Sequence, residues 1–159
     1  MEFRQQARPS DEAAVREIVS STGFFSEAEV DVAVELVQER LRRGDASGYF
    51  FLFAEIDGRP VGYACYGPIA CTIGSYDLYW IAVHKEYQHR GLGRALLLAT
   101  ERKIWEAKGR RIYVETSSRP QYRPTREFYA HFDYRVEAEL ADFYAPGDGK
   151  IIYSKAAGL

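Results

Sequence analysis

Two glycines in a short polar segment carry the strongest chemical signal in this 159-residue sequence. Gly91 and Gly93 lie within the segment 88–94, which follows an apolar, aromatic and β-branched run and precedes an apolar-periodic one. The first run predicts a strand and the second a helix, so the segment is a strand-to-helix turn. Glycine allows another molecule to approach the backbone closely, in left-handed conformations that other residues avoid, and the first amides of a helix have no intrahelical partner. We therefore expect this turn to bind a phosphate or pyrophosphate.

Other phosphate-binding motifs fit the segment less well. A Rossmann loop would place its third glycine at position 96, where this chain has Leu96, and a P-loop requires Gly-Lys followed by Ser or Thr. A kinase-type loop needs His-Arg-Asp and Asp-Phe-Gly partners that the sequence lacks. The two glycines could also merely end one element and begin another, and Gly-x-Gly alone does not decide between these interpretations.

The remaining patterns predict the elements that position this turn. Strands are predicted at residues 2–8, 49–56, 61–66, 76–83, 111–116, 135–144 and 150–155, and helices after residue 10, from 26 to 44, from 93 to 108 and from 125. Ser26 and Glu29 form a capping box at the start of the second helix, and Asp57-Gly58 predicts a hairpin turn. The order indicates a mixed α/β sheet flanked by helices, with a parallel crossover from strand 76–83 to strand 111–116.

Composition restricts the class of protein. The length predicts a single domain spanning residues 1–159, and a net charge of −2 gives no support for a nucleic-acid partner. We find no apolar run of membrane-spanning length and no signal-peptide core, so we expect a cytoplasmic protein without membrane contact. A homodimer is compatible with these properties. The three histidines lack the spacing of a zinc site, so no metal is expected, and both Cys65 and Cys71 are expected to be small buried thiols.

Three motifs together resemble the GNAT family of N-acetyltransferases. The run Gln88-His89-Arg90-Gly91-Leu92-Gly93 resembles the family's coenzyme A loop, and F-Y-A-H-F-D-Y at 128–134 is similar to its F-Y-x-x-x-G-F/Y helix. The strand end E-T-S-S and the order of elements also match. Asp133 stands where the family has glycine, so it is expected to hold a positive φ.

The resemblance implies a GNAT fold, acetyl-CoA as co-substrate and no metal. In such proteins the pantetheine arm pairs with the central strand, and that strand and the following parallel one splay apart to admit the thioester. Backbone N–H groups near Ile81 to Val83 would then polarise the acetyl carbonyl. The run is also typical of a buried core strand, and both interpretations can hold together. The residues that would bind the cofactor are Ile81, Ala82, Val83, Gln88, His89, Arg90, Gly91, Leu92, Gly93, Arg94 and Thr125.

The resemblance also suggests an acid and a base. An amine with a pKa of about 10 is protonated at neutral pH, and forming the neutral nucleophile costs about 4 kcal/mol. Glu115, at the end of its strand, matches the family's strand glutamate that acts as base, but a solvated carboxylate is the alternative. Tyr129 matches the motif tyrosine that protonates the departing thiolate, with a packing role as the alternative. No cysteine is placed by motif to carry an acyl group, so direct transfer in a ternary complex is expected.

Three aromatic residues are the candidates for the acceptor site. Phe24, Phe25 and Tyr66 are candidates to line a pocket for a small amine or amino acid, or they belong to the core. We expect an N-acetyltransferase acting on a primary amine of a small molecule or amino acid. The alternatives are acetylation of a protein N-terminus or lysine, and a non-catalytic acyl-CoA sensor. A nucleotide-dependent oxidoreductase is disfavoured by the glycine pattern and the length.

Overall fold

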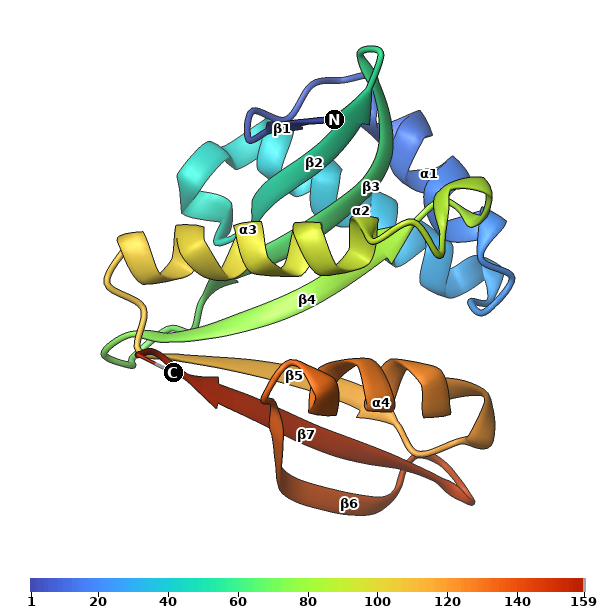
Figure 1. Cartoon of the computed structure of the whole chain (residues 1–159), viewed down its shortest axis with the longest axis vertical. Coiled ribbons are helices and arrows are strands. Elements are labelled where there is room, and N and C mark those ends of the chain that lie inside the picture. The colour runs from blue at the N-terminus through green and yellow to red at the C-terminus, as the bar shows by residue number, and fades with distance from the viewer. Residues whose placement is uncertain (159) are drawn as a thin grey trace. The chain divides into compact units, whose positions relative to one another are not determined.

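The computed structural model describes residues 1–158 and has the predicted order of elements (Figure 1). Seven strands form one mixed sheet in the order β1-β2-β3-β4-β5-β7-β6, accompanied by four α-helices, which confirms the predicted fold class. The helices and strands are β1 Glu2–Arg4, α1 Asp11–Ser21, α2 Glu27–Arg43, β2 Phe50–Ile56, β3 Arg59–Pro68, β4 Ser75–Val83, α3 Leu92–Glu106, β5 Arg111–Ser117, α4 Arg123–His131, β6 Arg135–Ala145 and β7 Asp148–Ala156.

The chain folds into two compact units. The first contains Met1–Gly67 and Leu78–Ile104, and the second contains Pro68–Asp77 and the chain from Trp105 onward. The boundary therefore passes through β4, between Asp77 and Leu78. The chain crosses from one unit to the other at three positions.

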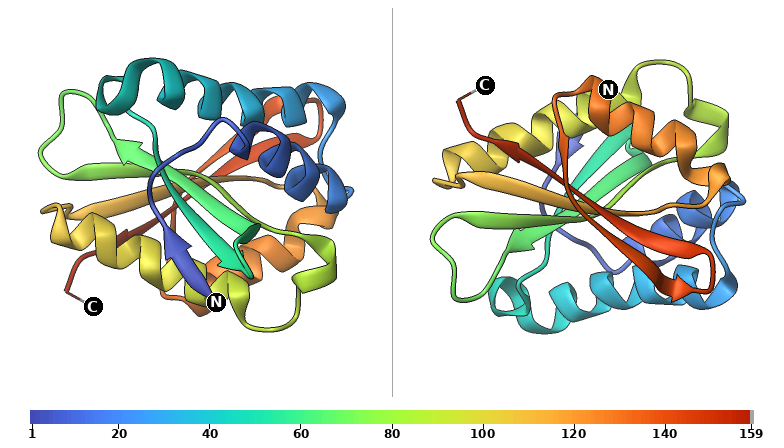
Figure 2. Two further views of the ribbon diagram at one scale, coloured as in Figure 1. Left: turned by 90° about the horizontal axis from the view of Figure 1, so that it is seen from above. Right: turned by 90° about the horizontal axis from the view of Figure 1, so that it is seen from below.

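In the first unit, helices cover both faces of the strands. Helices α1 and α2 lie on one face of β2 and β3, and α3 lies on the other (Figure 2). The core under α1 and α2 is built from the apolar positions of the predicted helical and strand periods. Its buried members are Val15, Ile18, Val19, Val30, Ala33, Val34, Val37, Phe51, Phe53, Tyr63, Cys65 and Ala82.

Helix α2 begins with the predicted capping box. The Ser26 side chain accepts a hydrogen bond from the Glu29 amide at 3.2 Å, and the Glu29 carboxylate accepts one from the Ser26 amide at 3.1 Å. Strand β1 is shorter than predicted and ends at Arg4. There the Arg4 guanidinium binds the carboxylates of Asp11 and Glu55, at 2.8 and 3.1 Å, which turns the chain toward α1.

The two cysteines differ, contrary to the expectation that both are buried. Cys65 is buried in the core, and this burial raises the pKa of its thiol above the usual range. Cys71 is exposed and has a φ of 64°. It belongs to the connection before β4, where residues 70–73 are all exposed because connecting segments run over the protein surface.

In the second unit, α4 packs on β7, where the Tyr129 and Tyr153 rings meet, and its Arg126 is bonded to the end of β5. The parallel pairing of β4 with β5 joins Ser75 to Arg111 and Asp77 to Tyr113, so the predicted crossover is parallel. Helix α4 begins two residues before the predicted Thr125, because Pro124 is well suited to a first helical turn. Asp133 has a φ of 68°, as predicted.

Within residues 1–158, none of the helices combines the length and the apolar character needed to cross a membrane. In the same part of the chain, His, Cys, Asp and Glu side chains form no group of three or more that could hold a metal ion.

Candidate active site

The turn between β4 and α3 exposes the start of a long helix. The first helical hydrogen bond runs from the Ala95 amide to the Gly91 carbonyl at 3.0 Å, so Gly91 is the N-cap of the 15-residue helix α3. The amides of residues 92–94 therefore have no partner within the helix and lie at the positive end of its dipole. This arrangement is suited to an anionic ligand.

Only one of the two motif glycines uses glycine's conformational freedom. Gly91 has a φ of 80°, and a Cβ added to it would meet no atom within 4 Å. His89 also has a positive φ, 63°. Gly93 lies in the first turn of α3 and, contrary to expectation, is not among the described residues with positive φ. A helical conformation is open to any residue, so Gly93 is not required for its backbone freedom. Its lack of a side chain serves at most to leave the helix end uncovered.

The polar side chains of the turn have different roles. The Gln88 amide nitrogen donates to the Val83 carbonyl at 3.0 Å, so this side chain braces the turn. The guanidinium carbon of Arg90 lies 5.3 Å from the centre of the Tyr87 ring. Arg90 and Arg94 are both exposed and place positive charge at the start of α3.

The end of β4 supplies core packing and backbone donors. Ala82 is buried in the core, while Ile81 and Val83 are half-buried. The His84 amide donates to the Val61 carbonyl of β3 at 2.8 Å. Because successive N–H groups of an extended chain point to opposite edges, the Val83 N–H is directed away from β3. The end of β4 can therefore serve both as a core strand and as a source of free backbone donors.

Glu115 lies on an exposed face of β5. Its neighbours Val114 and Thr116 are buried, whereas its own side chain is 49% exposed. One carboxylate oxygen lies 2.9 Å from the Nζ of Lys150 on β7. Sequence reasoning missed Lys150, because the two residues become neighbours only through the β5–β7 register.

Tyr129 lies in an aromatic cluster under α4. Its ring centre is 5.4 Å from that of Tyr134 and 6.2 Å from that of Tyr153. Burial raises the pKa of the Tyr129 phenol above its usual range, so the hydroxyl retains its proton at neutral pH. Tyr129 therefore contributes to packing, and its burial also favours the protonated form that an acid requires.

The two candidate catalytic residues lie on opposite faces of the strands. Tyr153 pairs with Val114 across β5 and β7, so it shares the face of Val114 and of Tyr129. Glu115 follows Val114 and therefore points to the other face. The strand backbone separates the carboxylate from the phenol, so they cannot exchange a proton directly.

The first turn of α4 is tied to the end of β5. Thr125 lies there and is half-buried. The next residue, Arg126, donates to the carbonyls of Ser117 and Arg119 at 2.8 and 2.9 Å. These bonds fix the loop between β5 and α4, and they therefore also fix the position of Thr125 within the second unit.

The predicted acceptor residues have different surroundings. Phe25 packs edge-on to Trp80, with ring centres 4.9 Å apart, and contacts the core. Tyr66 is buried and stacks with Phe50 at 6.0 Å. Phe24 is 43% exposed. Two of the three therefore contribute to packing, and Phe24 remains accessible.

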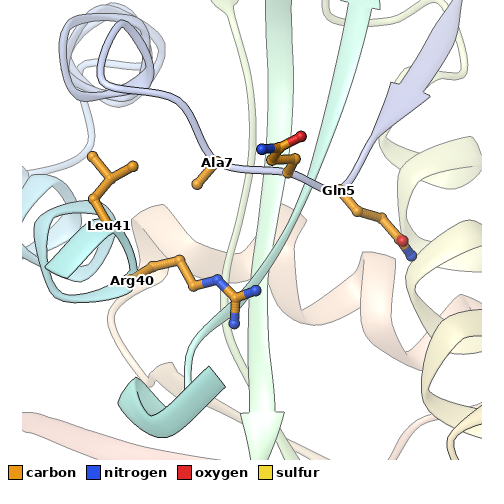
Figure 3. Close-up of a pocket in the computed structure, with 5 residues that line it drawn as sticks. Gln5, Ala7, Arg40 and Leu41 are labelled. Atoms are coloured by element: carbon orange, nitrogen blue, oxygen red, sulfur yellow. The ribbon is translucent and has the colours of Figure 1, made fainter. Parts of the chain in front are cut away.

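A pocket of about 350 Å³ lies elsewhere in the first unit. Residues 5–7 face Arg40 and Leu41 of α2 across it (Figure 3). The Arg40 guanidinium is already paired with Asp45 at 2.8 Å and with the Tyr49 carbonyl at 3.3 Å. None of the predicted site residues lines this pocket.

Comparison with known proteins identifies the family. The acetyltransferase (GNAT) domain family matches residues 47–136. A crystal structure of a Desulfovibrio desulfuricans protein assigned to the GNAT family is 50% identical, covers 98% of each chain and has a TM-score of 0.95. No functionally curated protein matches the chain.

More distant structures share the fold alone. An aminoglycoside 6′-N-acetyltransferase complexed with coenzyme A is 16% identical, with a TM-score of 0.77 over 98% of this chain and 97% of that one. A ribosomal-protein-alanine N-acetyltransferase from Brucella melitensis is 21% identical, with a TM-score of 0.77 over 98% of this chain and 99% of that one. The half-identical structure and the family match, which includes the turn, β5 and α4, lead to one conclusion: this chain belongs to the GNAT family of acetyltransferases.

Proposed function

We propose that this protein transfers the acetyl group of acetyl-CoA to a primary amine of a small molecule or amino acid. The observation that carries the proposal is the exposed N-terminus of α3, capped by Gly91 in a conformation natural to glycine. Membership of the GNAT family supports the reaction class, and a structural neighbour binds coenzyme A. The named acceptors of the neighbours, an aminoglycoside and a protein alanine, both present amines.

In this proposal the turn holds the pyrophosphate. The amides of Leu92, Gly93 and Arg94 would donate to its oxygens, and the exposed guanidinium groups of Arg90 and Arg94 would neutralise its charge. His89 and Gly91 keep the backbone of the turn in the required shape through their positive φ values. The bound thioester supplies the activated acetyl group.

The end of β4 would act on the acetyl carbonyl. The Val83 N–H, directed away from β3, is suited to donate to the oxygen on which negative charge develops. Such donors act most strongly where water is excluded. Ile81, two residues earlier, has its N–H on the same edge.

Glu115 and Tyr129 would handle different protons. Glu115 takes the proton of the acceptor ammonium, directly or through water, while Tyr129 donates a hydrogen bond to the departing thiolate. A thiol has a pKa of about 8.5 and a phenol about 10 in water, and burial of Tyr129 widens this gap. Full proton transfer to the thiolate is therefore unfavourable from this phenol, and stabilisation by a hydrogen bond is its main contribution.

A glycine pair within the chain provides the test. Gly91 and Gly147 both have a φ of 80° and open space around them, but Gly147 lies in the β6–β7 turn. Gly91→Val is expected to weaken acetyl-CoA binding at least about tenfold, because the side chain would cover the helix amides, whereas Gly147→Val should bind normally. Calorimetric titration measures affinity, and thiol release with a panel of amines measures turnover.

The results separate the alternatives. Binding with amine-dependent thiol release supports the proposal, and binding without release for any amine supports an acyl-CoA sensor instead. If the wild-type protein does not bind acetyl-CoA, or if the two valine variants bind equally, the assignment of the turn is wrong.

A further inference from the structure

A lysine of the protein occupies the place next to its candidate base. Lys150 Nζ lies 2.9 Å from a Glu115 carboxylate oxygen, 3.7 Å from the centre of the Phe143 ring and 5.7 Å from that of Tyr144. The Lys150 side chain is only 13% exposed. A carboxylate and aromatic faces together are the groups that proteins use to bind an alkylammonium ligand.

The backbone fixes this arrangement. Glu115 pairs with Ile152 and Ser117 pairs with Lys150, so the glutamate and the lysine project from the same face of neighbouring strands. Phe143 and Tyr144 come from the end of β6, where the register with β7 is irregular between Leu140 and Ala145. The extra residues bring the two aromatic rings around Lys150 from the edge of the sheet.

An acceptor amine that gives its proton directly to Glu115 must come within hydrogen-bond distance of that carboxylate. Lys150 already meets this requirement without a substrate. Its side chain is also a primary alkylamine, which is the class of acceptor proposed above.

We propose that Lys150 is an acetylation site of this protein, modified by the protein's own acetyl transfer. The inference rests on the proposed function, because it requires acetyl-CoA as donor and Glu115 as base. Glu115 accepts one proton from the Nζ ammonium, and the neutral nitrogen forms a bond to the acetyl carbon. The carbon–sulfur bond breaks, coenzyme A leaves as a thiolate that takes up one proton, and the amide nitrogen loses its second proton to water. The net products are acetyl-lysine, coenzyme A thiol and one proton.

Acetylation would change the surroundings of Glu115. The amide carries no charge, so the ion pair and the cation–π contact with Phe143 are lost. The carboxylate is then available to an external amine. Lys150 therefore acts first as acceptor and afterwards no longer competes for the base.

The test compares Lys150 with an exposed lysine under two acetyl donors. Lys108, which follows α3, is exposed and serves as the reference. With acetic anhydride and no acetyl-CoA, Lys108 should react faster, because Lys150 is covered and ion-paired. With acetyl-CoA the order should reverse, and Lys150 should be modified at least about tenfold faster than Lys108, as peptide mass spectrometry of timed samples would show.

Two variants complete the experiment. With acetyl-CoA as donor, Glu115→Gln should slow acetylation of Lys150 by roughly 10²-fold. With acetic anhydride, Lys108 should still react at least as fast as Lys150, although the difference between their rates can become smaller. Lys150→Arg keeps the positive charge and should remove the modified peptide, whereas Lys108→Arg should not change the yield at Lys150.

The outcomes distinguish the inference from the proposed function. If the protein acetylates an added amine but Lys150 stays unmodified, the inference is overturned and the proposed function stands. If Lys150 and Lys108 keep the same order with both donors, the modification is chemical and the inference is also overturned. Failure to bind acetyl-CoA would remove the proposed function and the inference with it.

Discussion

At the scale of single residues, Tyr129 illustrates how burial determines what a proton donor can do. Its phenol packs beside the rings of Tyr134 and Tyr153, and burial raises its pKa. If Tyr129 stabilises the leaving thiolate by a hydrogen bond, Tyr129→Phe keeps the packing and removes only that bond. We expect kcat to fall by roughly 10²-fold with little change in acetyl-CoA affinity, measured by steady-state kinetics and calorimetry.

Tyr134→Phe is the matched control, because it removes a second buried phenol oxygen from the same aromatic cluster. Its kcat should stay close to that of the wild-type protein. Equal losses in both variants would assign Tyr129 to packing alone.

Residue types and spacing predicted the position of the turn between β4 and α3 better than they predicted the contacts of its side chains. The motif predicted a strand-to-helix turn over residues 88–94, which the structure contains, but Gly91 rather than a later residue caps α3, Gln88 braces the Val83 carbonyl and Gly93 is helical. These details depend on local hydrogen bonds that a residue pattern does not encode. Lys150 could not be predicted at all, because only the pairing of distant strands brings it to Glu115.

At the scale of elements, the end of α4 tests the expectation for Asp133. This residue holds a φ of 68°, and the following Tyr134 amide donates to the Tyr129 carbonyl at 3.0 Å, which closes the helix. Asn tolerates this conformation as Asp does, but a β-branched side chain does not. Asp133→Val should therefore lower the free energy of unfolding by about 1–2 kcal/mol relative to Asp133→Asn.

Urea unfolding of the two variants measures this difference as a shift in midpoint at constant slope. Equal stability of the Asp133→Val and Asp133→Asn variants would show that the connection between α4 and β6 relaxes to another conformation. The Asn variant also controls for loss of the carboxylate charge.

Elements with strong local signals were predicted well. The capping box of Ser26 and Glu29 formed as expected, and helical periodicity located α2 and α3 within about two residues at each end. Strand β1 was predicted too long, since its end is determined by the contacts of Arg4 with Asp11 and Glu55. Such contacts between distant residues are invisible to periodicity.

At the scale of the whole molecule, the single-domain expectation can be tested with the protein's two tryptophans. Trp80 belongs to the first unit and Trp105 to the second. The chain crosses between the units at three positions, so we propose that they unfold together. Trp80→Phe and Trp105→Phe each leave one fluorescent reporter, and the two urea transitions should coincide with that seen by circular dichroism in each variant.

Separate transitions would contradict this proposal and would show that the units are thermodynamically independent. Because Trp80 packs against Phe25, its replacement is expected to lower stability, so each variant is compared with its own circular dichroism curve.

The division of β4 between the two units also bears on protein synthesis. Residues 68–77 leave the ribosome before residues 78–104, yet they belong with the chain from Trp105 onward. Ser75 to Asp77 must therefore remain without their β5 partners while α3 is translated, a delay on the order of seconds. A ribosome that stops soon after Ile104 would release a chain whose first unit has its full sequence, attached to a strand segment that lacks its β5 partner.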